Sequence, residues 1–256
     1  MTNVAAITGA ASGIGRGTVR RLLDDGWTVV ALDVSEPGLA SLRKELASYA
    51  GRLDTLAADV RTEASLAAAF ERIAARHGRL NGLVASAGLL RTGPLDQMPT
   101  GEFDDLFAVN VRGLWLTAKL AMPLLKSTAA KGEAARVVFL ASIAGIRHKI
   151  ESGAYAATKS AVIALTKVWA VESAPSGVLI NAVAPATVDT PMVAPYMNPG
   201  ANVRYKTSGA SPLGRIADPA DVASVIAFLL GPDAGYVNGT VIPVDAGTSA
   251  AFVPKG

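Results

Sequence analysis

The stretch Thr8-Gly9-Ala10-Ala11-Ser12-Gly13-Ile14-Gly15 joins a short apolar run, residues 4–8, to a helical pattern that begins near residue 14. A glycine-rich turn that opens a helix lets backbone N–H groups and the helix dipole meet a pyrophosphate. An ordinary strand-to-helix turn is the alternative, because glycine is common in this chain. The stretch therefore predicts a strand–turn–helix unit that binds a dinucleotide. The candidate contacts in it are Gly9, Ser12, Gly13, Ile14 and Gly15.

The rest of the chain repeats the alternation of short apolar runs with longer helical patterns. Strands that are buried on both faces are almost wholly apolar, as several of these runs are. The expected strands are 4–8, 28–32, 53–57, 82–85, 136–141, 178–184 and 241–244. The expected helices are 14–25, 37–49, 63–77, 102–127, 153–173 and 219–230, with Thr62 and Asp218 as N-caps. This order predicts a single doubly wound Rossmann-type α/β domain over residues 1–256, with a parallel sheet of about seven strands between two helical layers.

One segment, residues 190–212, departs from this alternation and is rich in proline. Long irregular connections inside a domain are usually lids or binding loops. We therefore expect residues 190–212 to form a substrate-binding loop.

Composition excludes several classes of function. The chain has no cysteine and only two histidines, so neither a thiolate metal site nor a three-histidine zinc site can form, and no metal is expected. The net charge of +3 is too weak to indicate a nucleic-acid partner. The longest charge-free stretch, residues 173–188, contains two prolines and is shorter than the roughly 20 residues of a spanning helix. With no signal-peptide pattern at the N-terminus, we expect a cytoplasmic protein without a membrane partner.

Two aspartates lie where the second and third strands end. Asp33 falls 18 residues after Gly15, where a carboxylate accepts hydrogen bonds from the adenosine ribose and repels a 2′-phosphate. Because Val34 and Ser35 follow it instead of basic residues, the sequence predicts NAD and not NADP; a solvated loop aspartate is the alternative. Asp59 and Val60 are expected beside the adenine, with capping of the next helix as the alternative reading of Asp59.

Tyr155 and Lys159 are four residues apart and therefore share one face of a helix. A free tyrosine has a pKa near 10, and a nearby ammonium lowers that pKa because it favours the phenolate. Ser142 ends the fifth strand, at the sheet edge where ligands bind in such folds. Its hydroxyl is placed to hold a carbonyl oxygen while Tyr155 transfers the proton. A bare Tyr-x-x-x-Lys is common by chance, and its order after a glycine turn and a strand-end serine makes it informative.

These motifs resemble those of the short-chain dehydrogenase/reductase family in its roughly 250-residue form, over the whole chain. The resemblance implies a catalytic tetrad of Asn110, Ser142, Tyr155 and Lys159, in which Asn110 holds a water that links Lys159 to solvent. It also implies that Lys159 binds the nicotinamide ribose, and that the chain is a homotetramer. The further cofactor contacts that it implies are Tyr155, Ala87, Gly88, Val188 and Thr190. Val188 and Thr190 would dock the nicotinamide carboxamide, by backbone and by hydroxyl.

Two motifs depart from the family pattern. Ala85-Ser86-Ala87-Gly88 replaces the usual Asn-Asn-Ala-Gly, and Pro185-Ala186 replaces the usual Pro-Gly. The first change is expected to be structural, whereas the second falls near the nicotinamide and is expected to alter the wall of the pocket. Neither change touches the tetrad.

The features together predict an NAD-dependent oxidoreductase that interconverts a secondary alcohol and a ketone, with Tyr155 as general acid/base and a small molecule as substrate. An NADP-dependent reductase of 3-ketoacyl thioesters on acyl carrier protein is one alternative, which Asp33 opposes. A non-catalytic dinucleotide-binding scaffold on the same fold is another, because fold does not fix function.

Two further expectations rest on particular side chains. Trp115, Leu116, Val162, Leu165 and Trp169 suggest more apolar helix surface than one side of a sheet buries, in keeping with a tetramer. The basic run 147–149 lies in the loop that the resemblance puts over the substrate, and Arg204 and Lys206 lie in the loop 190–212. The favoured interpretation is that these basic side chains are solvated. The alternative is an anionic substrate.

Overall fold

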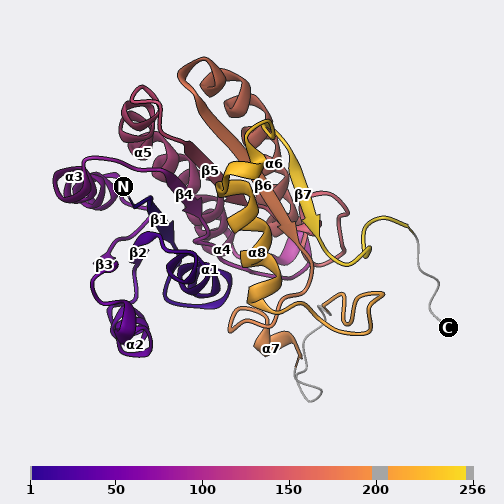
Figure 1. Cartoon of the computed structure of the whole chain (residues 1–256). Helices are drawn as coiled ribbons and strands as arrows, with labels where there is room; N and C mark the ends of the chain where they lie inside the picture. The colour runs from indigo at the N-terminus through magenta and orange to yellow at the C-terminus, as the bar shows by residue number, and fades with distance from the viewer. Residues whose placement is uncertain (1, 198–206, 252–256) are drawn as a thin grey trace.

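Seven parallel strands form one sheet at the centre of the protein, with helices on both of its faces (Figure 1). The computed structural model describes residues 2–197 and 207–251. The strand order is β3-β2-β1-β4-β5-β6-β7, and every neighbouring pair is parallel. The predicted α/β fold is therefore confirmed. The strands are β1 (Val4–Thr8), β2 (Thr28–Asp33), β3 (Leu53–Ala57), β4 (Gly82–Ala85), β5 (Ala135–Leu140), β6 (Val178–Pro185) and β7 (Val241–Val244).

The central strands are apolar on both faces because helices cover both. Along β1, Ala5 and Ile7 face one apolar core, and Val4 and Ala6 face the other. The first core is closed by α1 (Gly13–Asp24), α2 (Glu36–Glu45) and α8 (Pro219–Leu230). The second is closed by α3 (Glu63–His77), α5 (Leu114–Ala129) and α6 (Gly153–Ser173). Each Leu- or Phe-sized side chain buried there contributes about 1.5–3 kcal/mol relative to exposure.

The two predicted N-caps differ in the structure. Before α8, the Asp221 carboxylate accepts the Asp218 backbone N–H at 2.8 Å, and Pro219 occupies the first helical position, as predicted. Thr62 does precede α3 in extended backbone, but its side chain makes no capping hydrogen bond. The N-cap position predicted for Thr62 is therefore confirmed, whereas its side chain does not cap the helix.

The helix expected over residues 102–127 is confirmed in extent, but it is not one regular α-helix. Residues 100–129 form α4 (Thr100–Phe107), a π-helical segment (Ala108–Gly113) and α5. Two residues that are distant in the sequence, Leu89 and Val60, contact this segment. The Asn110 side chain bonds to the backbone of Leu89, and a Cβ on Gly113 would lie 2.8 Å from a methyl of Val60. Short π-helical segments within helices frequently mark functional sites.

Where it is described, the irregular region after β6 contains one short helix, α7 (Ala194–Met197). Val188 pairs with Ala217 in an isolated parallel bridge, which ties the start of this region to the segment before α8. Arg204 and Lys206, for which the sequence left a role toward an anionic substrate as the alternative, lie outside the described residues. Among those that are described, no helix is long and apolar enough to cross a membrane.

Candidate active site

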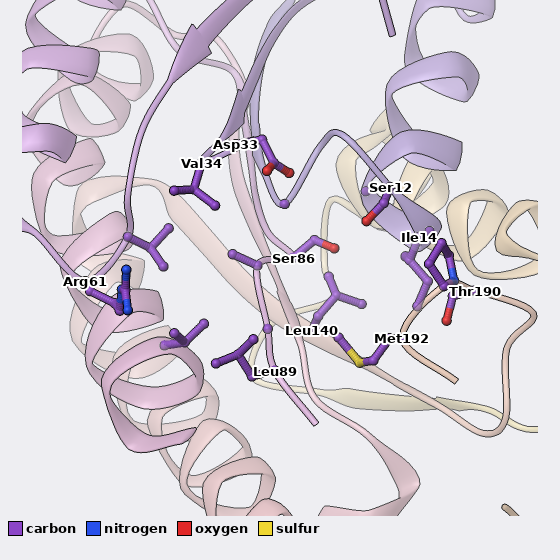
Figure 2. A pocket seen from close by; sticks show the side chains of 18 of the residues that line it. Ser12, Ile14, Asp33, Val34, Arg61, Ser86, Leu89, Leu140, Thr190 and Met192 are labelled. Carbon is purple, nitrogen blue, oxygen red and sulfur yellow. The ribbon is translucent and has the colours of Figure 1, made fainter. Parts of the chain in front are cut away.

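The carboxyl ends of the strands open into a cavity of about 470 Å³, which we call the glycine-loop cavity. Its walls come from the turn after β1 and from the ends of β2, β3, β4 and β5 (Figure 2). It lies where the strand order reverses between β1 and β4, the usual ligand position in a doubly wound sheet. The predicted cofactor contacts that line it are Gly9, Ser12, Gly13, Ile14, Gly15, Asp33, Asp59, Val60, Ala87, Gly88, Tyr155, Lys159 and Thr190.

The glycines of the first turn leave no room for side chains. A Cβ on Gly15 would lie 2.1 Å from the carbonyl oxygen of Gly9, and a Cβ on Gly9 would lie 2.8 Å from the Cα of Ala87. Gly9 also has a φ of +66°, in the left-handed region that favours glycine. The turn is thus packed directly against the segment after β4, and its backbone lines the cavity.

Asp33 ends β2 with its carboxylate held by two backbone donors. The N–H of Ala11 donates to Oδ2 and the N–H of Ser35 donates to Oδ1, each at 2.9 Å. A carboxylate oxygen has more than one acceptor position, so both atoms retain capacity for a ligand hydroxyl. Figure 2 shows Asp33 on the same side of the cavity as Ser12, with Arg61 across from them.

Asp59 lies two residues beyond the end of β3 and pairs with Arg61 at 2.8 Å. The Arg61 guanidinium holds the pKa of Asp59 below its ordinary value, because it donates hydrogen bonds to the carboxylate. The alternative role, capping of α3, is not seen, since the hydrogen bonds of the Asp59 carboxylate go to Arg61. Arg61 was not identified from sequence, although its position two residues after Asp59 was a signal.

Lys159 is buried on α6, one turn after Tyr155. Its Nζ donates a hydrogen bond of 2.7 Å to the Leu140 carbonyl at the end of β5 and lies 5.7 Å from the centre of the Tyr155 ring. Burial lowers the pKa of Lys159 to about 8, because the interior disfavours the ammonium. At neutral pH the side chain is therefore still mostly positively charged beside the tyrosine.

Asn110 is held rigidly in the π-helical segment. Its Oδ1 accepts the Leu89 N–H at 2.7 Å, and its Nδ2 donates to the Leu89 carbonyl and to Thr158 Oγ1. Asn110 lines neither the glycine-loop cavity nor the second cavity described below, but it lies close to Lys159. A Cβ on Gly88 would lie 3.4 Å from Asn110 Oδ1 and 3.8 Å from Lys159 Nζ. The structure thus brings Asn110 Oδ1 and Lys159 Nζ near the same point beside Gly88.

A second cavity, of about 500 Å³, adjoins the first, and we call it the loop-lined cavity. Ser142 lines it two residues beyond β5, with its Oγ accepting the Ala144 N–H at 3.2 Å. Tyr155 and Met192 line both cavities, so the tyrosine lies between them. Ala186, the departure from Pro-Gly, is also in this wall. Met192 belongs to the predicted loop 190–212 but was not singled out from sequence as a residue between the two cavities.

The described parts of the predicted loop 190–212 contribute a large share of the loop-lined cavity. They supply Met192, Val193, Thr207, Ser208, Ala210, Ser211 and Pro212. Val188, by contrast, is buried and lines neither cavity; its carbonyl accepts a long hydrogen bond from the Thr190 hydroxyl, at 3.4 Å. Of the two residues expected to dock the carboxamide, only Thr190 is therefore in the wall of the glycine-loop cavity.

Comparison with known proteins identifies the family of this chain. The family model described as Enoyl-(Acyl carrier protein) reductase matches residues 9–249. A curated relative, cis-4-hydroxycyclohexanecarboxylate dehydrogenase from Sinomonas cyclohexanicum, is 38% identical over 248 residues, which cover 96% of both chains. The chain therefore belongs to the short-chain dehydrogenase/reductase family, as the motifs suggested.

Two solved structures share the fold over nearly the whole chain. The 3-ketoacyl-(acyl-carrier-protein) reductase from Brucella melitensis, complexed with NADH, has a TM-score of 0.88 and 31% identity, and covers 96% of this chain and 98% of its own. A single-residue variant of actinorhodin polyketide ketoreductase, with NADPH, has a TM-score of 0.90 and 29% identity, and covers 98% of each chain. Relatives of this fold thus bind either reduced nicotinamide dinucleotide.

Proposed function

We propose that this protein interconverts a secondary alcohol and a ketone, with Tyr155 as the general acid/base and NAD as the cofactor. The observation that carries the proposal is the position of Tyr155 in the wall shared by the two cavities, beside the buried Lys159. The named activity of the Sinomonas relative, a hydroxycyclohexanecarboxylate dehydrogenase, is of the same reaction class. A screen of secondary alcohols, followed by the absorbance of reduced nicotinamide, tests the proposal.

The glycine-loop cavity fits a dinucleotide. Gly9 and Gly15 let the turn after β1 pack directly against neighbouring backbone, and this turn and the N-terminus of α1 line the cavity. The tetrad residue Lys159 and the carboxamide candidate Thr190 line the cavity too. A nicotinamide dinucleotide bound there supplies the acceptor or donor of the hydride.

The residues of the chain position the substrate and transfer its proton. In the oxidative direction, the Tyr155 phenolate takes the hydroxyl proton of the alcohol, and in the reductive direction its hydroxyl returns a proton to the carbonyl oxygen. The Lys159 ammonium favours the phenolate by its charge. The Ser142 hydroxyl holds the substrate oxygen. A proton relay through a water beside Asn110, implied by the family resemblance, stays a prediction.

The preference for NAD over NADP rests on Asp33. Its carboxylate lines the cavity, and the three basic residues in the described wall have other partners: Arg61 bonds to Asp59, Arg91 to the Leu90 carbonyl and Lys159 to the Leu140 carbonyl. A 2′-phosphate beside Asp33 would meet a like charge. Catalytic efficiency measured with each cofactor tests this, and equal efficiency or a preference for NADP would contradict it.

The principal alternative is an NADP-dependent reductase of 3-ketoacyl thioesters on acyl carrier protein. The name of the Brucella relative favours this substrate, although that structure carries NADH. Asp33 argues against the NADP part of the alternative. A non-catalytic scaffold is the remaining alternative, and cofactor-dependent turnover of any secondary alcohol excludes it.

The organisation of the whole protein is also part of the proposal. We infer that residues 1–256 act as one dinucleotide-binding and catalytic unit, with 190–212 as its substrate-binding loop, and that the protein is a cytoplasmic homotetramer without nucleic-acid or membrane partners. The prediction that Leu116 and Val162 contribute apolar surface to a subunit interface is wrong, since both are fully buried in the core. The exposed apolar positions on α5 and α6 are Trp115, Val168 and Val171. Light scattering at micromolar concentration tests the tetramer.

A further inference from the structure

The loop-lined cavity carries an excess of positive charge. Arg147, His148 and Lys149 all line it, from the loop between Ser142 and α6. Among its described lining residues there is no aspartate or glutamate. Hydroxyl groups supply most of the remaining polarity of the wall. These are the side chains of Ser142, Ser152, Tyr155, Thr187, Thr207, Ser208, Ser211 and Thr248.

Arg147 is held against the wall by the C-terminal part of the chain. Its Nη1 donates a hydrogen bond of 2.6 Å to the carbonyl oxygen of Thr248, which lies 101 residues further along the sequence. In the described part of the chain no carboxylate pairs with Arg147. A guanidinium has five N–H donors in a planar fork, so one bond to a carbonyl leaves most of that fork for a ligand.

The turn that receives Arg147 is itself well braced. The buried Asp245 accepts the Gly247 N–H at 3.0 Å and the Ser249 N–H at 2.8 Å, and its carbonyl accepts the Thr248 hydroxyl. These bonds fix the direction of the Thr248 carbonyl. Arg147 is thus positioned by a carbonyl group whose own orientation is set by hydrogen bonds within the protein.

The other two basic residues also belong to an ordered loop. His148 Nδ1 lies 2.9 Å from the Ala144 carbonyl, and the Ser152 hydroxyl donates to the Lys149 carbonyl at 2.9 Å. Lys149 is half-buried, unlike a freely solvated lysine. The first contact holds the His148 side chain, and the second holds the backbone at Lys149. A loop that is already ordered loses less conformational freedom when it binds an anion, which favours affinity.

We propose that the substrate is a secondary alcohol or ketone that also carries an anionic group, a carboxylate or a phosphate ester, and that Arg147 binds this group with support from Lys149. The inference rests on the proposed function, because it takes the loop-lined cavity as the substrate site. It reverses the interpretation favoured from sequence, in which the basic run is merely solvated. The reason is that the cavity contains three basic side chains, has no acidic side chain among its described lining residues, and fixes Arg147 through Thr248.

The test measures binding of probes that need no turnover. Cyclohexanecarboxylate and cyclohexyl phosphate are compared with the neutral cyclohexanecarboxamide by calorimetry, on protein saturated with reduced cofactor. We expect at least one anion to bind about tenfold or more tightly than the amide, as for a hydrogen bond to a charged group. Equal binding of the amide and both anions would overturn the proposal. A preference for the phosphate or for the carboxylate identifies which anionic group the site takes.

Variants then assign the preference to Arg147. Arg147→Gln is expected to remove most of the anion preference while leaving the affinity for the amide within about twofold, and Lys149→Gln to remove a smaller part. Arg72→Gln is the matched control, since Arg72 is an exposed arginine on α3 that lines neither cavity. If Arg147→Gln weakens amide and anions equally, its role is structural and the proposal fails. If the preference survives in the double variant of Arg147 and Lys149, the proposal also fails.

Failure of the proposed function would look different. A protein that prefers anions in calorimetry but oxidises no alcohol with either cofactor would retain the anion site and lose the enzymatic proposal. A protein that turns over only neutral alcohols, with no anion preference, would retain the enzymatic proposal and lose the anion site.

Discussion

The two cavities meet at Tyr155 and Met192, yet they are built from different materials. The glycine-loop cavity is formed by strand ends and by a turn in which backbone atoms pack against backbone atoms, as Gly9 does against Ala87. The loop-lined cavity is formed by three connecting segments, with exposed side chains such as Arg147 and His148 in its wall. The first is therefore intolerant of added atoms, whereas the second can change its side chains without disturbing the sheet. Under the proposed function, this division separates the cofactor, in the glycine-loop cavity, from the substrate, in the loop-lined cavity.

The sharpest test of the comparison is Tyr155→Phe, because this side chain serves both cavities. Phenylalanine keeps the ring and loses the proton donor and acceptor, so we expect kcat to fall by about 10²–10⁴-fold with little change in cofactor affinity. Steady-state kinetics and cofactor titration measure the two effects. Tyr236→Phe, at a fully exposed position, is the control and should retain full activity. A Tyr155→Phe enzyme that keeps more than about a tenth of its kcat would contradict the proposed mechanism.

The second prediction concerns the buried charge of Lys159. The pKa of this residue is about 8 in the folded protein, against an ordinary value of 10.5. Between these two values the unfolded chain holds the proton that the folded protein has released, so stability rises with pH. Relative to Lys159→Met, the wild-type free energy of unfolding should rise by about 2–3 kcal/mol from pH 7 to pH 10.

Urea unfolding of the cofactor-free proteins at several pH values measures this difference. Well below pH 8 both states hold the proton, and the difference between the two proteins should be flat there. A difference that falls with increasing pH would show that Lys159 is not charged and desolvated as described.

The third prediction tests the close packing of the glycine turn. In Gly15→Ala, the new Cβ would be placed 2.1 Å from the Gly9 carbonyl oxygen, so backbone must move. We expect a loss of about 1–3 kcal/mol in stability, together with weaker cofactor binding. Gly51→Ala is the matched control, because no atom lies within 4 Å of its Cβ position. Thermal unfolding and cofactor titration of both variants check the prediction, and equal behaviour of the two would refute it.

The smallest expected effect is on cofactor choice. Asp33→Asn keeps an acceptor oxygen for the Ala11 N–H and removes the negative charge. The ratio of catalytic efficiencies, NAD over NADP, should fall by about tenfold, since one unfavourable charge contact is relieved. Asp233→Asn, on an exposed turn, removes the same charge elsewhere and should leave the ratio unchanged. An unchanged ratio in Asp33→Asn would mean that another group selects the cofactor.

The sequence by itself determined the sheet, the glycine turn and the helical pairing of Tyr155 with Lys159. These features depend on local periodicity and short spacings: apolar runs of about five or six residues, and a separation of four residues on one helix. The end of β2 at Asp33 could likewise be located to within one residue, because an apolar run stops there.

Only the tertiary structure decided where the remaining parts of the site lie. The π-helical segment at 108–113 meets side-chain and backbone contacts from Leu89 and Val60, which no local pattern encodes. The orientation of Arg147 depends on the Thr248 carbonyl, 101 residues away. Met192 joins the two cavities because its loop folds back over the ends of the strands. Each of these contacts joins residues far apart in the chain, and its energy exists only once the sheet has brought them together.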